Sequence, residues 1–420
     1  MAVSSEVKAF LREDALRRFL SYVKVYTTSD DESGKTPSSE REFDLARQLE
    51  RELREIGLSD VETDEFCYVY ATLPASPGCK GPVISFCAHL DTSGAAPGEN
   101  VKPVFHRNYD GGVIAFADDP DLRLGPPDSP ELSRFVGEDI ITASGKTLLG
   151  ADDKAGVAEI VAGLAALKKF PELRHPEIRV CITPDEEIGG GTAKIRTEKL
   201  GKLCYTFDGG EVGEIETECF NAHMAKIKFI GVNVHPGYAK NIMLNAGAIA
   251  ARYVAALPEW QTPEHTELRE GFFHLLKIGG DENEASIQFI IRDFEAETNQ
   301  KRMVFLKSLA DVFMKKYPGL KVEVEIKEQY RNMVEVLNNA LAVVEVAQKA
   351  IEMSGVKVIR KAIRGGTDGA KLCFMGIPTP NVFAGGLLFH SKREWIPVVA
   401  LERAAEVFVN ICGLWYEKTL

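Results

Sequence analysis

The sequence predicts an α/β fold in two parts: a domain built on a mostly parallel β-sheet flanked by helices, and a smaller α+β domain that interrupts it. The chain has 420 residues, more than one hydrophobic core normally supports, so two domains are expected. Helix and strand patterns alternate in the first segment, change in the middle of the chain, and then resume. We therefore expect domain segments at residues 1–218, 219–332 and 333–420.

The composition is that of an ordinary globular protein without a basic surface. There are 62 acidic and 50 basic residues, and the formal net charge is −12, which argues against nucleic acid or an anionic membrane as a partner. The N-terminal segment carries charges throughout and lacks the apolar run of a secretion signal. No segment reaches the roughly 20 apolar residues of a membrane span. Eight scattered cysteines without a C-x-x-C spacing indicate reduced thiols and a cytoplasmic location.

The first segment reads as helices that alternate with buried strands. A helix is predicted up to Gly57 because its apolar residues lie on one face, namely Leu45, Leu49, Leu53 and Ile56. A Gly/Pro/Asp-rich stretch follows Asp91, and a second amphipathic helix begins near Lys154 and ends before Pro171. The expected strands lie in VETDEFCYVYATLPA, PVISFCAHL, IRVCITP and KLCYTFD. This alternation predicts a largely parallel sheet covered by helices.

The middle segment has a different order of elements. AKIKFIGVNV, GFFHLLKIG and ASIQFIIRDF read as strands, and long helices separate them. One helix is expected to bury the face formed by Phe305, Leu309, Val312 and Phe313. The strand after it alternates Val322, Val324 and Ile326 with charged residues. A β-α-β-β-α-β order fits these signals, which predicts a small ferredoxin-like domain.

Polar residues collect where the strands of the first domain are predicted to end. In SFCAHLDTSG, His89 and Asp91 close an apolar strand and point the same way, because side chains alternate along a strand. The other groups at such positions are Asp152/Asp153, Asp185/Glu186/Glu187, Asp208 and, after the strand-like NVFAGGLLFH, His390. Each group alone also fits a surface turn, a helix cap or an acidic loop. Together they favour one site beyond the carboxyl ends of the strands.

These side chains are suited to two zinc ions. Zinc binds imidazole nitrogen and carboxylate oxygen, and a bridging carboxylate lets two ions share one water. Two ions about 3.5–4 Å apart acidify that water and polarise a carbonyl together. The carboxylates balance the charge of the metals. Of two adjacent glutamates, one can bind metal while its neighbour acts as a general base.

Several motifs resemble a known family. HLDT, GADDKAG, PDEEIGGG, the isolated Asp208 and the late His390 resemble the co-catalytic di-zinc exopeptidases related to glutamate carboxypeptidase. ENVKPVFHRNYDGG, TLLGADDKAGVAEI, VNVHPGYAK and RGGTDGA are more closely similar to the peptidase T family of that superfamily, the tripeptide aminopeptidases. The resemblance runs from about residue 10 to the C-terminus. It implies that the inserted domain is a lid that closes over the cleft.

The resemblance also implies a role for each residue of the predicted site. Two zinc ions per subunit would have five ligands: His89 and Asp208 for one ion, Glu187 and His390 for the other, and Asp152 as the bridge. Glu186 would be the general base and later the proton donor. Asp91 would fix the ring of His89 by a hydrogen bond. The family further implies a cis peptide bond between Asp152 and Asp153.

The inserted domain is expected to contact the substrate. The family uses the histidine that matches His235 to stabilise the tetrahedral oxyanion, and the alternative is a histidine in a polar loop. Arg292, Asn332 and Arg364 are candidates to bind the peptide backbone or its C-terminal carboxylate. The planar guanidinium of arginine suits a carboxylate because it can pair with both oxygens. Many arginines form only surface pairs, and the sequence does not decide which of the two binds the carboxylate.

The combined expectation is a cytoplasmic di-zinc metallopeptidase that removes the N-terminal residue from tripeptides. A homodimer is a candidate assembly because many relatives dimerise through the inserted domain. One alternative keeps the metals and changes the substrate, as in an N-acyl amino acid deacylase or a carboxypeptidase. Another is a non-catalytic binding protein on the same fold. The sequence fixes neither the side-chain preference of the substrate nor the identity of the native metal.

Overall fold

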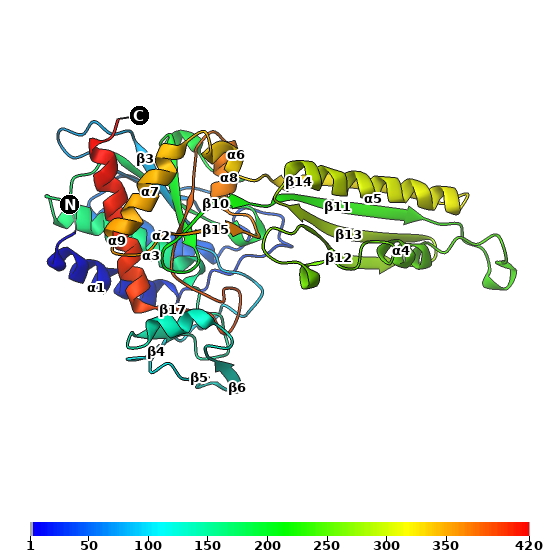
Figure 1. The fold of residues 1–420 in the computed structure, drawn as a ribbon, viewed down its shortest axis with the longest axis horizontal. Coiled ribbons are helices and arrows are strands. Elements are labelled where there is room, and N and C mark those ends of the chain that lie inside the picture. The colour runs from blue at the N-terminus through cyan, green and yellow to red at the C-terminus, as the bar shows by residue number, and fades with distance from the viewer. Residues whose placement is uncertain (1–2, 420) are drawn as a thin grey trace. The chain divides into compact units, whose positions relative to one another are not determined.

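The computed structural model describes residues 3–419, which divide into two compact units (Figure 1). Unit 1 combines the chain up to Thr217 with Glu335–Lys361 and the residues from Thr367 onward. Unit 2 comprises Glu218–Val334 and Ala362–Gly366. The prediction of an α/β fold with a separate, smaller α+β part is confirmed.

Unit 1 is built on an eight-stranded sheet in the order β1-β2-β8-β3-β9-β16-β10-β15. These strands are β1 (Ser59–Thr63), β2 (Val69–Leu73), β3 (Ile84–His89), β8 (Ile178–Thr183), β9 (Leu203–Gly209), β10 (Glu214–Cys219), β15 (Ile359–Ile363) and β16 (Asn381–Phe383). The central strands β8, β3, β9 and β16 are parallel. Strands β1, β2 and β10 pair in the antiparallel direction. The sheet therefore has the predicted parallel centre, with antiparallel strands toward its edges.

Helices cover both faces of this sheet. Neighbouring residues of a strand face opposite ways, and β3 is buried at every position, so both of its faces need cover. The helices of unit 1 are α1 (Ser5–Tyr22), α2 (Glu42–Ile56), α3 (Ala151–Lys169), α6 (Val334–Leu337), α7 (Leu341–Met353), α8 (Asp368–Phe374) and α9 (Val398–Glu417). On one face the rings of Phe86 and Phe408 lie 4.2 Å apart, and α1 and α9 pack on α3. On the other face Cys87 shares a core with Leu372 of α8.

A close approach of α3 to β9 places two of the predicted site residues near each other. A Cβ at Gly156 would lie 1.8 Å from the carbonyl oxygen of Phe207, so only glycine permits this packing. The first turn of α3 is irregular, because Asp152 and Asp153 have non-helical φ and ψ. The beginning of α3 therefore lies beside the carboxyl end of β9, which carries Asp208.

The Gly/Pro/Asp-rich stretch after Asp91 contributes strands to two small sheets that the sequence does not predict. Strand β5 (Ile114–Phe116) pairs with β6 (Asp119–Leu124). Strand β7 (Ile140–Thr142) lies between β4 (Val104–His106) and β17 (Trp395–Pro397). Trp395 fills the core of this region. Strands of three to six residues are too short to show a clear period of two in the sequence.

Unit 2 has the predicted β-α-β-β-α-β order. Its elements are β11 (Asn221–Ile230), α4 (Ala246–Val254), β12 (Phe272–Gly280), β13 (Glu284–Asp293), α5 (Ala296–Lys316) and β14 (Lys321–Tyr330). The sheet order is β12-β13-β11-β14, and all neighbouring strands are antiparallel. One core joins the strands to both helices through residues such as Ile287, Tyr253 and Phe313. This arrangement is ferredoxin-like.

Some local predictions are wrong. The buried face of α5 contains Leu306, Ala310 and Phe313, whereas Phe305 and Val312 are exposed. Apolar residues occur on more than one side of α5, and the sheet covers only one of those sides.

The positions expected for two site residues also differ from the structure. The strand expected to lead to His390 ends at Phe383, because Gly385 has a φ of 86° and turns the chain. Asp152 and Asp153 do not end a strand, but they lie in the first turn of α3, beside the helix start that the sequence predicts near Lys154. Within residues 3–419, no helix is long and apolar enough to cross a membrane. All eight cysteines are free thiols.

Candidate active site

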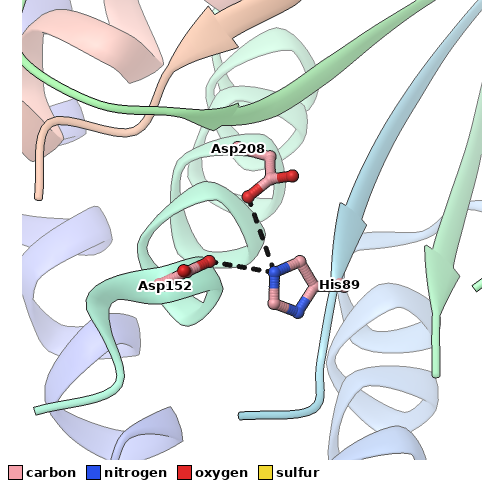
Figure 2. Close-up of side chains that lie close together, drawn as sticks. All are labelled: His89, Asp152 and Asp208. Carbon is pink, nitrogen blue, oxygen red and sulfur yellow. Dashed lines mark hydrogen bonds and ion pairs between the residues drawn. The ribbon is translucent and has the colours of Figure 1, made fainter. Parts of the chain in front are cut away.

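Side chains from three separate parts of unit 1 meet in one place, where two carboxylates contact the imidazole of His89 (Figure 2). His89 ends β3, Asp152 lies in the first turn of α3, and Asp208 lies in β9. The Nε2 atom of His89 is 3.0 Å from Oδ1 of Asp152 and 3.5 Å from Oδ1 of Asp208. They meet because β3 and β9 are neighbouring parallel strands and α3 packs on both.

A second group shares Asp152 with the first. The Nε2 atom of His390 is 3.1 Å from Oδ2 of Asp152 and 2.9 Å from Oε2 of Glu187. The two oxygens of one carboxylate therefore face two different histidines. In each group, His89/Asp152/Asp208 and Asp152/Glu187/His390, the candidate ligand atoms lie within 4.8 Å of one another. A carboxylate shared in this way is suited to bridge two metal ions.

The donor atoms fit metal ions better than they fit a network of ion pairs. Each group offers one imidazole nitrogen and carboxylate oxygens, which are the ligands that zinc accepts. Oε1 of Glu187 is buried and has no hydrogen-bond partner among residues 3–419. A buried acceptor without a partner costs about 1–3 kcal/mol. A cation between Glu187 and Asp152 would remove that cost.

The electrostatics of the site also favour a cation. Hydrogen bonds to Asp152 and Glu187 raise the pKa of His390 to about 11. Burial disfavours protonation of His89, but its neighbours, Asp152 foremost, raise its pKa well above the ordinary value. Burial raises the pKa of Asp208 to about 6 and that of Glu187 to about 7, and the charge of Asp152 adds to both shifts. Buried carboxylates thus attract positive charge, which a divalent ion supplies more fully than a proton.

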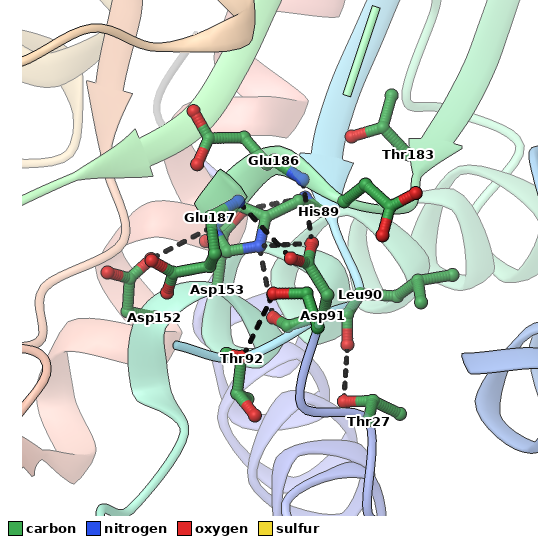
Figure 3. A network of polar contacts seen from close by, with 12 residues as sticks. Thr27, His89, Leu90, Asp91, Thr92, Asp152, Asp153, Thr183, Glu186 and Glu187 are labelled. Carbon is green, nitrogen blue, oxygen red and sulfur yellow. Dashed lines mark hydrogen bonds and ion pairs between the residues drawn. The ribbon is translucent and has the colours of Figure 1, made fainter. Parts of the chain in front are cut away.

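Asp91 contacts both His89 and the loop after β8 (Figure 3). Oδ1 of Asp91 lies 3.3 Å from Nδ1 of His89, and the main-chain oxygen of Asp91 lies 3.1 Å from the same atom. The carboxylate also accepts the N–H groups of Glu186 at 3.0 Å and Glu187 at 3.2 Å. The sequence predicts the contact with the ring. The contact with the loop depends on how β3 and β8 are placed, so the local pattern contains no sign of it.

Glu186 lines a small void beside the two groups. His89, Asp208 and Asp368 are among the other residues that line it. Burial raises the pKa of Glu186 well above its ordinary value, and the charge of Asp208 adds to the shift. A carboxyl group with a raised pKa next to candidate metal ligands is suited to accept and return a proton.

Comparisons with known proteins agree with this geometry. Residues 148–413 match the family described as peptidase family M20/M25/M40. Peptidase T from Clostridium acetobutylicum is 45% identical over 407 residues, which cover 97% of this chain and 100% of that protein. The chain belongs to the peptidase T family of M20 peptidases. It is therefore a metallopeptidase, and the resemblance in its motifs is confirmed.

Solved structures of other peptidases share the fold. A tripeptidase from Staphylococcus aureus is 22% identical, with a TM-score of 0.74, and the match covers 96% of this chain and 98% of that one. A dinuclear metal-binding M20 peptidase from Bacillus subtilis is 15% identical, with a TM-score of 0.66, and the match covers 97% and 98% of the two chains.

The peptidase has a cis peptide bond between Asp152 and Asp153, as the resemblance implies. The buried carboxylate of Asp153 accepts the N–H group of His89 at 3.1 Å. Asp153 therefore connects the first turn of α3 to the end of β3.

Sequence reasoning missed two buried acids of the peptidase. Glu394 accepts the N–H groups of Leu149 at 2.7 Å, Gly150 at 2.8 Å and Asp152 at 3.1 Å. Burial raises its pKa to about 7. Asp368 accepts a hydrogen bond of 2.7 Å from the hydroxyl of Thr183. Asp368 lies in the quoted motif RGGTDGA and Glu394 lies four residues after His390, but neither position by itself indicates a partner.

The remaining predicted residues belong to unit 2. His235 is exposed, and its Nδ1 accepts the N–H group of Gly237 at 3.1 Å, so Nε2 is the nitrogen that remains for a ligand. Arg292 donates to Oε1 of Gln329 at 2.9 Å, and its guanidinium lies 5.0 Å from the centre of the Tyr330 ring.

Asn332 and Arg364 contact other parts of unit 2. Oδ1 of Asn332 accepts the N–H group of Cys219 at 3.1 Å, and Nδ2 donates to the carbonyl of Phe294 at 3.2 Å. Arg364 donates to the carbonyl oxygens of Leu268 at 2.8 Å and Glu270 at 3.1 Å. The amide of Asn332 is thus engaged within the protein. The substrate-binding roles of these residues stay predictions.

We predict that Glu394→Ala reduces metal affinity or activity about 10–100-fold, the usual effect of losing a group that orients a ligand. Without its three acceptor contacts, the turn that presents Asp152 is no longer fixed. Metal titration and peptide cleavage measure the effect. Glu402→Ala on α9 is the control, because the carboxylate of Glu402 pairs with Arg12 of α1 and belongs to neither candidate ligand group. Equal metal affinity and activity in the two variants would contradict the assignment.

Proposed function

We propose that this peptidase is a cytoplasmic di-zinc aminopeptidase that removes the N-terminal residue from tripeptides. The observation that carries the proposal is the position of Asp152, whose two oxygens face His89 and His390 separately. The names of its relatives, peptidase T and tripeptidase, support the substrate class. Eight free cysteines support a reducing compartment.

The two groups around Asp152 would hold one zinc ion each. His89 and Asp208 belong to one group, Glu187 and His390 to the other, and Asp152 to both. When bound, the ions would lower the pKa of a water molecule and polarise the scissile carbonyl. Imidazole and carboxylate donors support zinc as the metal.

Glu186 would transfer the proton in this reaction. It would accept a proton from the attacking water and then give it to the leaving amine, so that one carboxylate serves both half-steps. Its position beside the void with His89 and Asp208 supports this role. The raised pKa that burial gives to its carboxyl group also supports it, because a more basic carboxylate accepts a proton from water more readily.

Unit 2 would supply substrate contacts. His235 would donate from Nε2 to the developing oxyanion, which the resemblance and the hydrogen bond at Nδ1 support. Arg292, Asn332 and Arg364 would bind the peptide backbone or its C-terminal carboxylate. Of the three, Arg292 has the fewest contacts to protein carbonyls that a ligand would need to replace.

The proposal predicts that the metal-free protein regains cleavage of a free tripeptide as zinc is added, with a plateau at two ions per chain. A matched tripeptide with an N-acetyl group should not be cleaved, because an aminopeptidase requires the free amine. Product analysis by mass during the titration provides the measurement. Cleavage of only the acetylated peptide would indicate a deacylase, and release of the C-terminal residue would indicate a carboxypeptidase. Either result would replace the proposed activity.

Glu186→Gln should lower kcat about 10²–10⁴-fold, the usual contribution of a general base. The amide keeps the size of the side chain but cannot accept the proton. Zinc stoichiometry should stay unchanged, because Glu186 belongs to neither candidate ligand group. Steady-state kinetics and metal analysis of the purified variant test both points. Glu172→Gln, at an exposed position, is the control. Near-normal turnover by Glu186→Gln would rule out this residue as the base.

His235→Ala should reduce kcat about 10²-fold, which is the lower end of the effect of losing one oxyanion donor. Zinc affinity should not change, because His235 lies in unit 2 and the ligand groups lie in unit 1. The matched control is His265→Ala, an exposed histidine of the same unit. A loss of similar size in both variants would show that His235 has no specific function.

A further inference from the structure

The loop that carries Glu186 and Glu187 begins with an unusual backbone conformation. Asp185 is left-handed, with a φ of 55°, and the short helix Glu186–Ile188 follows it. Successive N–H groups in such a turn point into one concave space, which attracts negative charge. In this protein the space is filled by carboxylates of the protein itself.

Two buried carboxylates accept the three consecutive N–H groups of this loop. Oε2 of Glu42 accepts the N–H of Asp185 at 3.2 Å. The two oxygens of Asp91 accept those of Glu186 at 3.0 Å and Glu187 at 3.2 Å. Asp91 lies two residues after the end of β3, whereas Glu42 is the first residue of α2 and comes from a distant part of the chain.

Glu42 also connects the loop to the segment before α2. Its Oε1 accepts the N–H of Ser39 at 3.2 Å and the hydroxyl of Ser38 at 3.4 Å. In return, both carboxylate oxygens of Asp185 lie 2.9 Å from the N–H of Ser38. Each of the two segments therefore donates a main-chain N–H group to a carboxylate of the other.

These contacts are made in the interior of unit 1. Glu42 is 0% exposed and Asp185 is 1% exposed. Burial and the charges of Asp91 and Asp185 raise the pKa of Glu42 to about 10. A buried carboxyl group is unfavourable unless hydrogen bonds compensate its lost hydration. An apolar side chain of the same size would avoid that penalty, but it could not accept the N–H group of Asp185.

We propose that Glu42 is a positioning residue of the active site, which fixes the loop 185–187 by accepting the N–H group of Asp185. Glu42 does not contact the reacting atoms. It acts through the backbone, so that the side chains of Glu186 and Glu187 stand where proton transfer and metal binding need them. This inference rests on the roles proposed above for Glu186 and Glu187.

A loosened loop would affect two measurable properties together. Glu187 would bind its metal ion less tightly, and Glu186 would be displaced from the attacking water. Losing a group that orients ligands usually reduces metal affinity or activity about 10–100-fold. KM should change less than kcat, because Glu42 lies in the interior and does not contact the peptide.

The test compares three variants of the full chain. Glu42→Met keeps the size of the side chain and removes both acceptors. Glu42→Gln keeps one acceptor, because its NH₂ group can only donate. Glu406→Met is the matched control, because Glu406 is also 0% exposed but lies on α9 and pairs with Lys8 and Arg403.

The measurements are zinc affinity of the metal-free protein, kcat and KM on a free tripeptide at saturating zinc, Tm, and amide hydrogen exchange of the peptide 184–190.

In Glu42→Met, the zinc affinity and kcat should each be about 10–100-fold lower than in the wild type. The peptide 184–190 should also exchange faster in this variant. Glu42→Gln should lie between Glu42→Met and the wild type in all three properties. Glu406→Met should lower Tm but leave zinc affinity, kcat and the exchange rate of the peptide 184–190 unchanged. If Glu42→Met does not fold, Glu42→Leu, which also removes both acceptors, replaces it in the comparison. The inference is overturned if every folded Glu42 variant keeps the zinc affinity, kcat and exchange rate of the wild type or of Glu406→Met.

Failure of the proposed function would give a different result. If the wild type with zinc does not cleave tripeptides, the proposed reaction is wrong. Zinc affinity and hydrogen exchange in the Glu42 variants would still measure whether Glu42 fixes the loop.

Discussion

Carboxylates gather in unit 1 around the end of β3, the first turn of α3 and the loop after β8, at positions that are mostly closed to water. Such groups are unfavourable in an interior unless cations or hydrogen-bond donors compensate their charge. Two histidines, His89 and His390, provide part of that compensation through Asp152. The unsatisfied oxygen of Glu187 shows that the compensation is incomplete without metal. The remaining organisation of the site follows from this concentration of negative charge.

Main-chain N–H groups supply the other part of the compensation. Glu394 accepts the amides of the turn before α3, Asp153 accepts that of His89, and Asp91 accepts two amides of the loop that carries the adjacent glutamates. In each case a buried acid holds the backbone of a segment that carries a candidate ligand. Such contacts fix the ligands before metal or substrate arrives, which is what a precise catalytic geometry requires.

The topology of the sheet explains why the ligands can converge. The central strands are parallel, so the ends of β3, β8 and β9 lie at the same edge of the sheet. Ligands of α/β proteins bind beyond that edge. Gly156 then allows α3 to approach β9, which brings the first turn of the helix to the same place. All residues of both candidate ligand groups belong to unit 1. Unit 2 is an antiparallel sheet with two helices and a core of its own.

The sequence by itself determined the fold class and the ferredoxin-like order of unit 2, and the resemblance of its motifs to a known family named the residues of both candidate ligand groups. These signals are local: apolar periodicity identifies helices and strands, and a histidine or acid that ends an apolar run stands out against it. The tertiary structure decided that the oxygens of Asp152 divide between two histidines, and that His390 lies in a loop well beyond β16.

Tertiary structure also decided which face of α5 is buried, and that Glu42 and Glu394 support the site. Their partners are main-chain amides, which every residue except proline possesses, so no residue pattern records such a contact. Residues 42 and 185 come together only when α2 and β8 have packed into one unit.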